Sequence, residues 1–166
     1  KAADGRISLA SRWLLMPYRF GAWLNMLWWT RRLPETVDIG DGVLLGRFPK
    51  RSTLSTIATV IDLTAEFPRL VVPGLAWRAF PCLDLLSLTA GRIREAALAV
   101  EEARRHGPVL ICCALGFQRS AVVAACVLVR AGHAASAAIA VAQIRAAGRP
   151  VHLPVEAYAV IDEAAR

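Results

Sequence analysis

The chain has 166 residues, 56% of them hydrophobic, and a formal net charge of +7 at pH 7. This length is enough for one domain with a full core. No stretch reaches the roughly 18 consecutive apolar residues of a membrane-spanning helix, because Pro17, Arg19 and Asn25 interrupt the best candidate. The four cysteines lack metal-ligand spacing and the density of a secreted disulfide scaffold, so we expect no metal, no cofactor and a reducing, cytoplasmic location.

Residues 1–33 are predicted to form an N-terminal amphipathic helical arm. Six basic residues and one acidic residue give this arm +5 of the net charge, and it holds four of the five tryptophans. Basic residues interleaved with Trp and Leu are typical of a helix lying in an anionic membrane surface. A helix packed on the rest of the domain gives the same pattern, and both interpretations stay open. We expect no nucleic-acid partner, since no binding module is visible. The start at Lys1 rather than Met predicts a piece of a longer protein.

Residues 34–166 are predicted to form the second part, in which short apolar runs alternate with helical patterns. We expect a hairpin over 37–46, strands over 59–63, 77–84 and 109–112, a loop around Pro68 and Pro73, and helices over 52–58, 89–105, 120–131, 134–147 and 154–165. This alternation predicts an α/β fold with a central, mainly parallel sheet flanked by helices.

The stretch 109–120 carries the chemistry. An apolar strand over 109–112 leads to Cys113, a loop containing Gly116 and Arg119 follows, and an apolar helix begins at Ser120. Such a loop presents backbone N–H groups and the positive end of the helix dipole, which hold a tetrahedral oxyanion and favour a thiolate. Arg119 offers a planar fork for two phosphate oxygens, which a Lys could not reproduce. The pattern predicts phosphate-ester cleavage through a covalent intermediate on sulfur.

This loop resembles the signature of the cysteine-dependent protein-tyrosine phosphatases, most closely the dual-specificity branch and its bacterial members. That signature is His-Cys, five residues, Arg, then Ser or Thr. Cys113, Gly116, Arg119 and Ser120 match it, whereas Cys112 stands where the family has His. The resemblance runs from about Val37 to the C-terminus and implies a dual-specificity phosphatase-like catalytic domain, in which Ser120 eases expulsion of the thiolate. The phosphate-binding residues would be Ala114, Leu115, Gly116, Phe117, Gln118 and Arg119, mostly through backbone donors.

A general acid is needed to protonate the leaving oxygen. Asp84 ends a predicted strand and precedes a helix, a position that resembles the mobile acid loop of the family. Asp62 is the alternative, although we expect it to order a neighbouring loop instead. The stretch 149–152 resembles a segment of mitochondrial phosphatidylglycerophosphate phosphatases and their bacterial relatives.

We therefore expect a phosphomonoesterase with a phosphocysteine intermediate. Its substrate would be a phosphotyrosine or phosphoserine/threonine protein, or a monophosphorylated lipid, and the sequence does not choose between them. The alternative is a non-catalytic, phosphate-binding and membrane-recruiting domain of a larger membrane protein. The complete Cys113, Arg119 and Asp84 set favours the enzyme, because a pure binding module needs no nucleophile.

Overall fold

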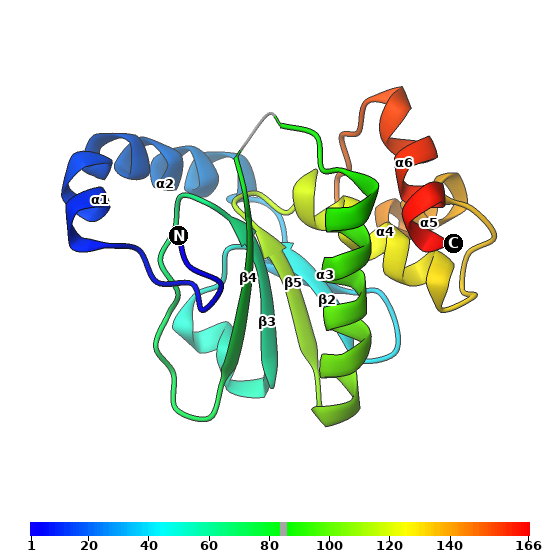
Figure 1. Cartoon of the computed structure of the whole chain (residues 1–166), viewed down its shortest axis with the longest axis horizontal. Coiled ribbons are helices and arrows are strands. Elements are labelled where there is room, and N and C mark those ends of the chain that lie inside the picture. Colours follow the sequence, from blue (N-terminus) through cyan, green and yellow to red (C-terminus); the bar gives the residue numbers. More distant parts are fainter. Residues whose placement is uncertain (84–85) are drawn as a thin grey trace.

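The computed structural model describes residues 1–83 and 86–166, apart from the side chains of residues 9, 11 and 12. A five-stranded sheet forms its centre, with the order β1-β2-β5-β3-β4 (Figure 1). The strands are β1 (Thr36–Asp38), β2 (Val43–Arg47), β3 (Thr59–Thr64), β4 (Ala76–Cys82) and β5 (Val109–Cys113). β1 pairs antiparallel with β2, and all other pairs are parallel. The predicted α/β class and the mainly parallel sheet are confirmed.

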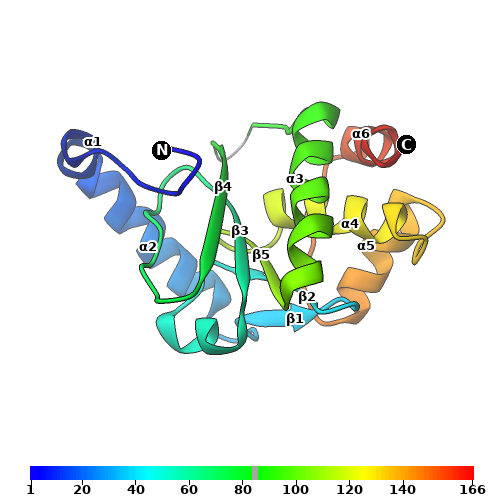
Figure 2. The same cartoon turned by 60° about the horizontal axis from the view of Figure 1, so that its bottom comes forward.

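Four helices lie on one side of the sheet (Figure 2). They are α3 (Ala90–Ala103), α4 (Arg119–Arg130), α5 (Ala137–Ala146) and α6 (Val155–Ala165). α3 and α4 contact the strands, and α5 and α6 pack against α4. Two short 3₁₀ helices, η1 (Arg51–Thr56) and η2 (Arg104–His106), flank the sheet at the amino ends of β3 and β5. Most predicted boundaries agree within two residues.

Two local predictions need correction. The helix predicted over 52–58 is a 3₁₀ helix, η1, that ends at Thr56. The helix predicted to start at Ala134 starts at Ala137 instead, because the Ser136 side chain accepts a hydrogen bond from the Ile139 amide and caps the first turn. The strand predicted over 77–84 is described as far as Cys82, and its expected end at Asp84 lies outside the described residues.

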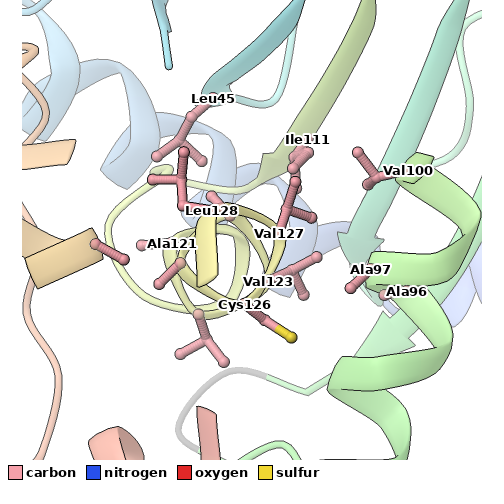
Figure 3. Packing of buried hydrophobic residues seen from close by; sticks show 14 of the residues in the cluster. Leu45, Ala96, Ala97, Val100, Ile111, Ala121, Val123, Cys126, Val127 and Leu128 are labelled. Carbon is pink, nitrogen blue, oxygen red and sulfur yellow. The ribbon is translucent and has the colours of Figure 1, made fainter. Parts of the chain in front are cut away.

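Small side chains allow α4 to lie close to both the sheet and α3. Figure 3 shows Ala96 and Ala97 of α3 facing Val123, Cys126 and Val127 of α4. Leu45 and Ile111 approach α4 from the sheet, and both are fully buried. Each such Leu or Ile contributes roughly 1.5–3 kcal/mol through burial. This core fixes the start of α4, and so the position of Arg119, relative to the carboxyl end of β5.

The N-terminal arm lies over the opposite face of the sheet. Its helices are α1 (Leu9–Leu14) and α2 (Met16–Thr30), and Figure 1 shows them beside the end of the sheet where β3, β4 and β5 terminate. The inner side of α2 buries Met26 and Thr30, and Met26 packs into a hydrophobic cluster that includes Phe48, Trp77 and Leu110. Its outer side exposes large apolar side chains, including Trp28 at 65% and Trp29 at 62%. Packing therefore explains only one side of the arm.

The segment before α1 pairs with the edge of β4. The Ala79 amide donates to the Ala3 carbonyl at 2.7 Å, and the Arg69 amide donates to the Gly5 carbonyl at 3.0 Å. Within residues 1–83 and 86–166, no helix combines the length and the apolar character that crossing a bilayer requires.

Candidate active site

β5 presents its two adjacent cysteines to opposite faces of the sheet. Cys113 belongs to the core cluster on the helix-covered side, and Cys112 belongs to the cluster on the arm-covered side. This follows from the period of two along a strand. Only Cys113, the last residue of β5, stands at the start of the loop that leads into α4.

Four consecutive carbonyl groups of this loop point outward and are held there. Phe48 N donates to Ala114 O at 3.2 Å, and His152 N donates to Phe117 O at 3.1 Å. Between them, the Arg149 guanidinium donates to Leu115 O and, at 3.2 Å, to Gly116 O. Because a peptide plane carries its N–H opposite its C=O, the loop amides are turned inward. The result is a nest of N–H groups of the kind that binds anions.

The Cys113 sulfur lies inside this nest. The Gly116 amide donates to Cys113 Sγ at 3.2 Å, and Ser120 Oγ lies 3.2 Å from the same sulfur. Gly116 has φ +79°, and a Cβ there would meet Arg149 Nη2 at 2.2 Å and the Gly46 carbonyl at 2.6 Å. Only glycine fits this position. The sequence did not predict that the backbone of Gly46 lies this close to Gly116.

Arg119, the first residue of α4, is held by a carboxylate that the sequence analysis missed. Arg119 Nη2 lies 2.7 Å from Glu66 Oε1, and Nη1 lies 3.1 Å from Glu66 Oε2. Nη1 also donates to the Cys82 carbonyl at 2.8 Å. Both side chains of the ion pair are 4% exposed. A bidentate pair in such a buried place fixes the plane of the guanidinium, and with it the direction of its donors.

Arg149 is a second buried guanidinium at the loop. Besides the two loop carbonyls, it donates to Pro34 O at 2.8 Å, and its centre lies 5.4 Å from the Phe117 ring. Burial lowers the pKa of Arg149 to about 10. The group therefore stays charged at neutral pH, and it both holds the loop and adds positive potential beneath it. The sequence singled out Arg149 only as part of the stretch 149–152 and did not predict these contacts.

Asp62 lies on the arm-covered side and is fully buried. It accepts hydrogen bonds from Lys1 Nζ at 2.5 Å, from the Thr64 amide at 2.8 Å and from Trp77 Nε1 at 3.1 Å. Burial raises the pKa of the Asp62 carboxyl, against the opposing effect of the Lys1 ammonium and Thr64. These contacts hold the end of β3 and the first residue of the chain, whereas the sequence led us to expect that Asp62 orders a neighbouring loop.

The predicted site residues thus fall into two groups. The structure brings together Cys113, the loop from Ala114 to Gln118, Arg119 and Ser120. Asp84, the predicted general acid, lies outside the described residues and stays a prediction. Glu66 and Arg149 come to the site from far away in the sequence.

The sequence matches no protein-family model and no curated protein. Solved structures give clear matches. Tk-PTP in its active form is 20% identical, with a TM-score of 0.69 over 80% of this chain and 97% of that chain. A mouse putative dual specificity phosphatase complexed with zinc tungstate is 20% identical, with a TM-score of 0.70 over 79% and 86%.

A third similar structure is PTPMT1 in complex with PI(5)P, which is 17% identical with a TM-score of 0.69 over 80% of this chain and 95% of that chain. All three alignments span most of both chains, so the likeness concerns the whole sheet with its helices and not the loop alone. The chain has the fold of the dual-specificity and tyrosine phosphatases.

Proposed function

We propose that this chain is a cysteine-dependent phosphomonoesterase with Cys113 as nucleophile. The observation that carries the proposal is the nest, in which four outward carbonyls turn the loop amides toward Cys113 Sγ. Inward N–H groups favour a thiolate and also bind the oxygens of a phosphoryl group. Arg119, oriented by Glu66, supplies donors for two of those oxygens.

The reaction takes two steps. Cys113 Sγ attacks phosphorus, so that a P–S bond forms while the P–O ester bond breaks, and Asp84 gives its proton to the leaving oxygen. Water then attacks the phosphocysteine and loses a proton to the Asp84 carboxylate, while the P–S bond breaks. Ser120 Oγ, 3.2 Å from the sulfur, stabilises the departing thiolate by a hydrogen bond. The nest and Arg119 stabilise the charge on the phosphoryl oxygens in both transition states.

The substrate would be a phosphoprotein or a monophosphorylated lipid. We would measure phosphate release from phosphotyrosine and phosphoserine peptides and from lipid phosphates in micelles. Cys113→Ser should abolish turnover while vanadate still binds. Cys112→Ser is the matched control and should keep substantial activity. It makes the same change at the adjacent cysteine, whose side chain lies on the opposite face of the sheet. Turnover that survives in Cys113→Ser would rule out the covalent mechanism.

We also propose that the arm binds an anionic membrane surface. Trp13 is 73% exposed, and Trp28 and Trp29 are similarly open. Arg31 lies 3.9 Å from the Trp28 ring centre, and Arg32 is exposed beside it. Exposed aromatic rings with adjacent cations suit the headgroup level of a bilayer. The arm also lies close to the site, because Arg19 Nε donates to the Glu66 carbonyl at 3.0 Å.

Exposed residues offer a test of the arm that leaves the core intact. Removing the whole arm would expose the hydrophobic cluster into which Met26 packs, so we would instead substitute Trp28→Ser together with Trp29→Ser. Co-sedimentation with vesicles that contain anionic lipid should fall in this variant and should weaken as salt rises. Ile139→Ser, at an exposed apolar residue of α5, is the control. If the wild-type chain stays in solution with anionic vesicles, the membrane proposal fails.

A further inference from the structure

A cavity of about 360 Å³ opens beside the phosphate-binding loop. Gln118 and Arg119 form part of its wall, and the segment after β4, α3, α4 and α6 form the rest. The lining is mainly aliphatic, with Leu86, Leu88, Ile93, Val122, Leu153 and Val160. A volume of this size lies at the lower end of the range for small-molecule sites.

We propose that this cavity binds the alkyl chain of a phosphomonoester whose phosphate lies in the loop. The inference rests on the proposed phosphatase function and narrows its substrate to an ester with a flexible apolar leaving group. Since the loop and the cavity share Gln118 and Arg119, the chain of such an ester begins where the cavity meets the loop.

The lining favours an alkyl chain over a peptide. A peptide would bring N–H and C=O groups into the cavity, and leaving them without partners is unfavourable. The polar side chains of the wall are few, with Ser87 and Glu156 beside the two loop residues. Apolar side chains also lie on the surface next to the cavity. Leu86 is 57% exposed, and Val155, which follows the lining residue Pro154, is 82% exposed. A chain that leaves the cavity therefore stays on an apolar path.

The test is a chain-length series of n-alkyl phosphates, from butyl to decyl, each below its micelle concentration. If the chain enters the cavity, kcat/KM should rise with length by up to about fourfold per methylene and level off once the cavity is full. Ala157 lines the cavity on α6, so Ala157→Phe should fill it and flatten this dependence. Ala159→Phe makes the same change at an exposed position of the same helix and should keep the dependence.

Binding of n-alkyl phosphonates, measured by calorimetry, separates this inference from the proposed function. If no phosphate ester is turned over but phosphonate affinity rises with chain length and Ala157→Phe removes the rise, the catalytic proposal fails and the cavity proposal stands. If affinity does not depend on length, or if Ala157→Phe keeps the dependence, the cavity proposal is wrong. Val160→Phe provides a second filling variant should Ala157→Phe fail to fold. Preference for phosphopeptides without any chain-length effect would also overturn it.

Discussion

The two adjacent cysteines at the end of β5 lie on opposite faces of the sheet and have different surroundings. On the helix-covered face, Cys113 lies within 3.2 Å of the Gly116 amide and of Ser120 Oγ. On the arm-covered face, burial and then the nearby Asp62 carboxylate raise the pKa of the Cys112 thiol well above its ordinary value. Neighbouring residues of one strand thus have different chemistry, because side chains alternate between the faces.

The faces also differ in how their charges are held. At the carboxyl end of the sheet, where a substrate can approach, Arg119 of α4 pairs with Glu66. On the arm-covered side, Lys1 and Asp62 form an ion pair whose side chains are 1% exposed or less. We infer that the first pair serves the reaction and the second serves the fold. The predictions below test this division.

The largest expected difference lies between the two candidate acids. Asp84→Asn should slow the release of poor leaving groups by roughly 10²–10⁴-fold, with a smaller loss for an activated phenol. Asp62→Asn should show no such dependence, because Asp62 is buried and bonded to Lys1, Thr64 and Trp77. Steady-state rates on phenyl phosphates of graded leaving-group pKa measure both. A dependence found for Asp62→Asn instead would reassign the acid to the arm-covered face.

Arg119→Lys keeps the charge but loses the fork that Glu66 orients. We expect a fall in kcat/KM of about 10²–10³-fold, the scale for loss of one positioned oxyanion donor. Arg130→Lys is the matched control, because Arg130 lies on the same helix and also forms a two-point contact, with Glu101. Similar losses in both variants would mean that damage to α4, and not loss of the fork, is being measured.

Lys1→Met should lower the free energy of unfolding by about 3 kcal/mol, because it leaves a buried carboxylate without its cation. The rate per folded molecule should change little. Adding Asp62→Asn to Lys1→Met should recover part of the lost stability, since no charge then remains unpaired. Urea unfolding of the two single variants and the double variant completes the cycle. Strictly additive losses would show that Lys1 and Asp62 do not stabilise each other.

The smallest effect concerns the thiol of Cys126 in α4. Burial raises its pKa to about 11 from an ordinary value of 9.0. As pH rises, the unfolded chain loses this proton before the folded chain does, so stability is full below pH 9.0 and falls as pH approaches about 11. The slope is at most about 1.4 kcal/mol per pH unit. Cys126→Ala should remove this part of the dependence of stability on pH, measured by urea unfolding at graded alkaline pH. If the variant and the wild-type chain show the same slope, the pKa of Cys126 is not raised.

Local spacing in the sequence was enough to predict the sheet class and the loop. Strand, loop and helix follow one another within the stretch 109–120, so the contacts of Cys113 with Gly116 and Ser120 lie within seven residues. The need for glycine at position 116 was likewise readable, because its cause is a backbone turn with φ +79°.

Other parts depended on which strands become neighbours. Glu66 reaches Arg119 across 53 residues, and Arg149 reaches the loop carbonyls across more than 30. No spacing rule links such residues, because the order of strands in the sheet is a property of the packed core. The orientation of the arm likewise could not be predicted from its sequence. Its composition gave an amphipathic helix, but only packing decided that Met26 and Thr30 face the core while most of the tryptophans face outward.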